Sequence, residues 1–295
     1  MSQEKISPSN VTPPPKTSRA GRNLPAAIGV GVALFGSVVV TLAWWNWGFV
    51  LFVAVALSLG VVELHRAMAR IGARSEVAPL VVGTLASVIG AYHAGQSSTT
   101  NLPANSLIIG LLALTSLGCL VMRLSRGAEG FVRDASASLF TLAYVPLMGS
   151  TVSLMLADDN GRARIITFLL CVIASDTGGY IAGVLFGKHP MAPKVSPKKT
   201  WEGFVGSVTA GMLLGAACSH WLLHASWLVG MLLGVLLVAF GTAGDLVESM
   251  VKRDVGIKDM SSFLPGHGGV MDRLDSLLVA APVAWFAMFM MVPAA

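Results

Sequence analysis

Charged side chains are scarce in this sequence. Asp, Glu, Lys and Arg make up 12% of its 295 residues, apolar residues make up 54%, and the mean hydropathy is +0.73. A soluble domain carries about a quarter charged residues, so 20 basic and 15 acidic side chains are too few to cover this much apolar surface. The composition excludes a soluble globule, a disordered chain and a coiled coil, and indicates a polytopic membrane protein.

Cysteine is scarce as well. Cys119, Cys171 and Cys218 lie far apart, each inside an apolar run. This spacing excludes a disulfide scaffold and gives no metal or redox motif, so we expect small packing residues. The motifs G-x-S-x-G, H-E-x-x-H and C-x-x-C are also absent.

Long apolar runs dominate what is present. Nine of them could cross about 30 Å of hydrocarbon as helices. We therefore predict an all-α polytopic membrane bundle of about nine helices, with a disordered cytoplasmic tail at 1–23 and a transmembrane domain at 24–295. The predicted spans are 24–43, 47–64, 77–95, 105–122, 136–157, 165–186, 203–224, 226–247 and 277–292.

The basic residues predict how the chain is oriented. All Lys and Arg except Arg162 and Arg164 lie in the tail or in alternate loops. Such a bias places these loops in the cytoplasm, the N-terminus with them, and the C-terminus outside. The net charge of +5 then reflects membrane loops, and we expect no nucleic-acid partner.

Acidic residues at membrane depth are costly and usually functional. Asp176 and Asp245 lie within or at the end of apolar runs, and Asp272 and Asp275 share one helix face at i, i+3. These acids also have purely structural explanations, namely helix packing and a helix N-terminus, where acidic side chains are favoured. Four carboxylates near one membrane surface would also form an oxygen-rich site for Mg²⁺ with substrate phosphates. We therefore divide the domain into scaffold helices, 24–164, and a polar active-site half, 165–295.

Groups suited to phosphate surround these acids. Gly266-His267-Gly268-Gly269 is a glycine-rich turn whose backbone N–H groups could approach an anion. A plain loop explains the turn equally well when it is taken alone, and positive-inside lysines explain the cations. The candidate phosphate-binding cations of this half are Lys198, Lys199, Lys252, Arg253, Lys258 and Arg273.

Three polar blocks resemble a known family. The long segment 244–275, from Gly244-Asp245-Leu246 to Asp272-Arg273-Leu274-Asp275, is similar to the signature of bacterial CDP-diacylglycerol synthases, also called phosphatidate cytidylyltransferases. Asp176-Thr177-Gly178-Gly179-Tyr180 and the block 196–203, Ser196-Pro197-Lys198-Lys199-Thr200-Trp201-Glu202-Gly203, resemble its other two blocks in the expected order. The resemblance covers roughly the last 125 residues.

The resemblance implies transfer of CMP from CTP to phosphatidate, giving CDP-diacylglycerol and pyrophosphate. It implies Mg²⁺, suggests K⁺ beside it, and suggests a homodimer in the bacterial inner (plasma) membrane with the active site facing the cytoplasm. The expected catalytic residues are Asp245, Asp272, Asp275, Lys252 and Arg253, and the expected metal ligands are Asp245, Asp272, Asp275 and Asp176. The expected substrate-binding residues are Asp176, Ser196, Lys198, Lys199, Thr200, Lys258, His267, Gly268, Gly269 and Arg273.

Two other classes compete with this interpretation. An ion-coupled secondary transporter would also place acids in the membrane, but we find no repeated half, and the polar blocks gather on one side of the membrane. A CDP-alcohol phosphotransferase would resemble a D-G-x-x-A-R motif, which the sequence lacks.

Overall fold

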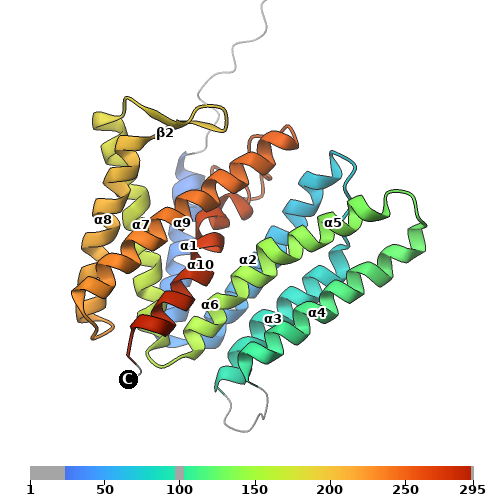
Figure 1. Cartoon of the computed structure of the whole chain (residues 1–295), viewed down its shortest axis with the longest axis horizontal. Coiled ribbons are helices and arrows are strands. Elements are labelled where there is room, and N and C mark those ends of the chain that lie inside the picture. The colour runs from blue at the N-terminus through green and yellow to red at the C-terminus, as the bar shows by residue number, and fades with distance from the viewer. Residues whose placement is uncertain (1–23, 97–102, 294–295) are drawn as a thin grey trace, which may run out of the picture.

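The computed structural model describes residues 24–96 and 103–293 and shows an antiparallel helical bundle (Figure 1). The predicted tail at 1–23 lies outside these residues. The elements are α1 (Leu24–Trp44), α2 (Asn46–Ala69), α3 (Val77–Gln96), α4 (Ala104–Arg123), α5 (Phe131–Leu142), α6 (Met148–Ala157), α7 (Gly161–Phe186), β1 (Pro190–Ala192), β2 (Ser196–Thr200), α8 (Trp201–Trp221), α9 (Trp227–Asp254) and α10 (Met271–Met291).

The predicted membrane class is confirmed. Among the described residues, seven helical segments are long and apolar enough to cross a membrane. One of them, Phe131–Ala157, joins α5 and α6 through a π-helical turn at Ala143–Leu147 that contains Pro146. Proline has no backbone N–H, so a local change in the hydrogen-bond pattern is expected there. The count of nine crossings and the orientation of the N-terminus stay predictions.

The antiparallel order gathers the basic loops at one end of the bundle. The loops at 70–76, 124–130, 187–200 and 255–270 all lie there, and the C-terminal end of α10 lies at the opposite end (Figure 1). We call the end of the bundle that carries these four loops the basic end. An antiparallel hairpin of β1 and β2, the one sheet in the described chain, also lies there and is the departure from the all-α prediction.

Glycines bring α7, α8 and α9 into close contact. A Cβ at Gly206 of α8 would lie 2.7 Å from the carbonyl oxygen of Gly178 in α7, so neither helix has room for a side chain there. Gly211 in α8 packs as closely on Gly234 of α9. Small residues at helix crossings allow such close approach of backbones in membrane proteins. The crossings fix the three helices that carry the polar blocks.

The remaining helices pack around α2, α6 and α10 at the centre of the bundle. Leu57 of α2, Met155 of α6 and Met288 of α10 are almost completely buried in one continuous apolar cluster. Cys119, Cys171 and Cys218 are free and buried, as predicted for packing residues.

Candidate functional site

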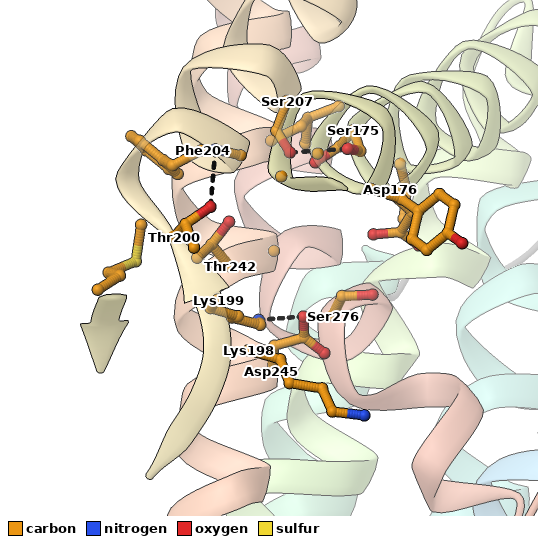
Figure 2. Close-up of a pocket in the computed structure, with 18 residues that line it drawn as sticks. Ser175, Asp176, Lys198, Lys199, Thr200, Phe204, Ser207, Thr242, Asp245 and Ser276 are labelled. Atoms are coloured by element: carbon orange, nitrogen blue, oxygen red, sulfur yellow. Dashed lines mark hydrogen bonds and ion pairs between the residues drawn. The ribbon is translucent and has the colours of Figure 1, made fainter. Parts of the chain in front are cut away.

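A pocket of about 230 Å³ opens at the basic end between α7, α8, α9 and β2. Asp176, Lys198, Lys199, Thr200 and Asp245 all line it, and they come from the three sequence blocks singled out above. Figure 2 shows β2 running beside α9, with Lys199 directed at Asp245. The fold therefore brings together residues that are up to 69 positions apart in the chain.

The start of α8 fixes the end of the hairpin, and with it the position of Lys199. The Thr200 hydroxyl accepts a hydrogen bond from the Gly203 N–H at 3.1 Å and so caps this helix. Lys199, one residue earlier, forms an ion pair with Asp245 of α9. On the other side of the pocket, the Ser207 hydroxyl donates to the Ser175 carbonyl at 2.7 Å and ties α8 to α7.

A second carboxylate joins Asp245 from α10. A Cβ at Gly244 would lie 2.5 Å from the carbonyl oxygen of Asp275, so only glycine allows α9 to approach α10 this closely. The Asp245 and Asp275 carboxyl groups consequently lie within hydrogen-bonding reach of each other, with Asp176 nearby. Asp176, Lys199 and Asp245 line the pocket, whereas Asp275 interacts with Asp245 without lining it. We call these four residues the pocket cluster.

The pocket cluster has the chemistry of a magnesium site that substrate would complete. Within the described ranges, no three His, Cys, Asp or Glu side chains are arranged as a metal cage. Magnesium is usually bound through only one or two carboxylates together with phosphate oxygens and water. Asp245 and Asp275 provide that pair, and one lysine does not balance two carboxylates. The residues fit the ion.

A second group of charges is packed beneath the surface, and we call Glu248, Lys252 and Asp272 the buried cluster. The Lys252 ammonium pairs with Asp272 at 2.9 Å and also with Glu248. Asp272 further accepts hydrogen bonds from the backbone N–H groups of Met260, at 2.9 Å, and Gly269, at 2.7 Å. Asp272, one of the four predicted metal ligands, therefore lies apart from the pocket, and its oxygens already bind the loop at 255–270.

The glycine-rich turn lies against these carboxylates. Gly268 has φ of +82°, which favours glycine, and its carbonyl accepts from the Leu264 N–H at 2.8 Å. The Gly269 N–H, predicted to face a phosphate, points at Asp272. His267 packs beside Gly31 of α1, and neither it nor the two glycines line the pocket.

The remaining predicted residues lie outside the lining of the pocket. Ser196 begins β2, and Arg253 donates from Nε to the Val195 carbonyl at 3.4 Å. Lys258 and Arg273 are exposed and form no ion pair with any described residue. None of these four lines the pocket, although Arg273 lies close enough to Asp176 to act on its charge.

Sequence reasoning missed residues from the half that it took as scaffold. Glu63 of α2 is buried at the start of α10, and Tyr144 in the π-helical turn is buried with no hydrogen-bond partner among the described residues. Glu63 carried the same signal that identified Asp176, an acid inside an apolar run. Thr242 and Ser276, which line the pocket, carried no such signal.

Known proteins resemble this chain over most of its length. The profile of the Cytidylyltransferase family matches residues 25–291. A protein of Mycobacterium leprae named phosphatidate cytidylyltransferase is 41% identical over 288 residues, which cover 91% of this chain and 88% of that protein. One of the same name from Mycobacterium bovis is 39% identical over 280 residues, covering 94% and 92%. Another, from Haemophilus influenzae, is 42% identical over 130 residues, covering 42% and 44%.

Proposed function

The chain belongs to the Cytidylyltransferase family and is a nucleotidyltransferase, and from that premise we propose that it transfers CMP from CTP to phosphatidate. The products would be CDP-diacylglycerol, for phospholipid biosynthesis, and pyrophosphate. The names of the relatives support the substrates. The observation that carries the proposal in this chain is the pocket cluster, in which lysine and paired carboxylates meet at the basic end of a membrane bundle.

The position of the pocket suits one soluble and one lipid substrate. CTP enters from water, whereas phosphatidate keeps its acyl chains in the membrane and presents its phosphate at the surface. A site where charged loops meet apolar helices reaches both. We propose that this surface faces the cytoplasm of a bacterial plasma membrane, as the basic loops indicate.

Transfer of CMP depends on neutralising the charge of the phosphates more than on moving a proton. A phosphatidate oxygen is already anionic at neutral pH and forms a bond to the α-phosphorus of CTP, while the bond from that phosphorus to the bridging oxygen breaks and pyrophosphate leaves. Asp245 and Asp275 would hold Mg²⁺, with Asp176 beside them. When bound, the ion supplies charge neutralisation and orientation of the phosphates.

Lys198 and Lys199 would bind the triphosphate. Lys198 is exposed at the pocket, and Lys199 is half-buried in its ion pair with Asp245. A lysine side chain is flexible enough to turn from a carboxylate to a phosphate a few ångströms away. The Lys199–Asp245 pair would thus keep both groups in place before substrate arrives, and phosphate would replace the carboxylate as the partner of the ammonium.

The test follows the fate of individual phosphates. Protein purified in detergent is incubated with phosphatidate, Mg²⁺ and CTP labelled at the α- or the γ-phosphate. We expect the α-label in a chloroform-soluble product, dependent on phosphatidate and Mg²⁺, and the γ-label in water-soluble pyrophosphate. Diacylglycerol, which lacks the phosphate, is the matched control lipid. Incorporation of the γ-label, or no lipid label from folded protein, would overturn the proposal.

A further inference from the structure

Glu63 is a buried acid without a basic partner. It lies in α2, 4% exposed, at the basic end of the bundle. No Lys, Arg or His among the described residues forms an ion pair with it, whereas the buried Asp134, Glu248 and Asp272 each have one. A buried carboxylate is costly unless hydrogen bonds compensate it, so its partners reveal what holds it there.

Those partners are the start of α10 and the loop before it. One carboxylate oxygen accepts the Val270 N–H at 3.0 Å and the Ser261 hydroxyl at 2.6 Å, and the other accepts the Met271 N–H at 2.8 Å. Free N–H groups at a helix N-terminus carry partial positive charge. The negative charge of Glu63 is therefore balanced by the first turn of α10, about 200 residues away in the chain.

The fit around Glu63 leaves little room for movement. A Cβ at Gly269 would lie 2.9 Å from the Glu63 carboxyl carbon, so the glycine-rich turn rests directly on this side chain. One turn earlier on α2, a Cβ at Gly60 would lie 3.4 Å from the Met271 sulfur. Gly60 and Glu63 thus form one face of α2 that receives the N-terminus of α10.

We propose that Glu63 is a positioning residue for the transfer, a role that rests on the proposed function. Met271, whose N–H it binds, precedes Asp275 by four residues, so both lie on one helix face one turn apart. Anchoring the Met271 N–H fixes the rotation of this turn of α10 about the helix axis and its position along that axis. Glu63 thereby sets Asp275 beside Asp245, and a rotation of α10 would separate the pair that would bind Mg²⁺.

The decisive variant is Glu63→Gln, which keeps the shape of the side chain. An amide NH₂ would face a backbone N–H where an oxygen now accepts. We expect kcat to fall about tenfold or more, because a misplacement of about 1 Å can cost 10²-fold. The Mg²⁺ concentration for half-maximal rate should rise several-fold. Amide hydrogen exchange over 269–272, measured without substrate, should accelerate.

Two further variants keep the test falsifiable. Ser261→Ala removes one of the three hydrogen bonds to the Glu63 carboxylate. It should change the same quantities in the same direction by up to about tenfold, since one hydrogen bond to a charged group contributes about 1.5 kcal/mol. Glu129→Gln makes the same chemical change at an exposed acid of the basic end and should change none of them. If Glu63→Gln does not fold, Ser261→Ala decides the question.

The outcomes separate the positioning role from ordinary stability. If Glu63→Gln lowers the unfolding temperature while folded protein keeps the wild-type kcat and Mg²⁺ dependence, the inference is wrong. The same holds if Ser261→Ala leaves both kinetics and exchange unchanged. If the wild-type protein makes no CDP-diacylglycerol, the proposed function fails, and that result is distinct because the exchange measurement does not depend on turnover.

Discussion

The pocket cluster and the buried cluster contain similar residues in different surroundings. In the first, the Asp245 side chain is 29% exposed and its described ion-pair partner is Lys199, a flexible side chain on a hairpin. In the second, Asp272 is 5% exposed and its oxygens are taken by Lys252 and two backbone N–H groups. The comparison teaches that an acid near a site can bind a ligand only while its oxygens have room for one. We therefore propose that the pocket cluster binds ligand and that the buried cluster anchors the loop at 255–270.

The largest expected effect is that of Asp245→Asn. Removing this charge should lower kcat/KM by about 10³-fold, the upper range for losing one electrostatic group at an active site. The unfolding temperature should hardly change, because the side chain is partly exposed. Initial rates and thermal unfolding of the same preparation measure both. Asp254→Asn, at the exposed end of the same helix, is the matched control and should keep wild-type activity.

Asp272→Asn should reverse this pattern. Breaking a buried ion pair by removing one partner typically costs about 3 kcal/mol or more, so we expect a clear drop in unfolding temperature. The protein that remains folded should retain measurable turnover. If instead Asp272 is the metal ligand that the family resemblance implies, the variant will lose turnover at unchanged stability, and the distinction between the clusters is wrong.

Lys199→Met should have an intermediate effect on substrate binding. Loss of one charge-assisted hydrogen bond, about 1.5 kcal/mol, corresponds to roughly a tenfold higher KM for CTP. The KM for phosphatidate should change less, provided that Lys199 binds the triphosphate. Steady-state kinetics with each substrate varied in turn measures this. Lys194→Met, an exposed lysine between the two strands, should leave both constants within about twofold.

Thr200→Val should have the smallest effect. It removes the hydroxyl that caps α8, worth about 1 kcal/mol of stability, and keeps a β-branched residue at the end of β2. We expect a small decrease in unfolding temperature and a modest rise in KM for CTP as the hairpin loosens. Thr209→Val, whose hydroxyl bonds only within its own helix, should change neither. Equal results for the two variants would argue against the capping role.

Hydropathy predicted the helices well but misplaced the ends that carry the site. α9 continues to Asp254, beyond the predicted end at 247, and α10 begins at Met271, before the predicted start at 277. In both places the helix continues past charged residues, of which Glu248, Lys252 and Asp272 are paired inside the protein. An apolar criterion ends a span where charged residues accumulate, whereas backbone hydrogen bonding continues through them.

The pocket could be predicted only in part. Asp176 and Asp245 stood out because acids are unusual in apolar runs, and Lys199 stood out through the loop block that resembles the family. The structure places the three together. The binding of Gly269 to Asp272, the anchoring of α10 by Glu63 and the β1–β2 hairpin depend on contacts between distant segments. No local pattern in the sequence encodes which N–H group a carboxylate will find.

The most direct test compares Asp245→Asn and Asp272→Asn over a full Mg²⁺ titration. Transfer of the α-label of CTP to lipid is measured for each and normalised to the amount of folded protein. The account predicts that Asp245→Asn stays near background at every Mg²⁺ concentration while Asp272→Asn reaches a measurable plateau. A plateau for Asp245→Asn with background rates for Asp272→Asn would contradict it.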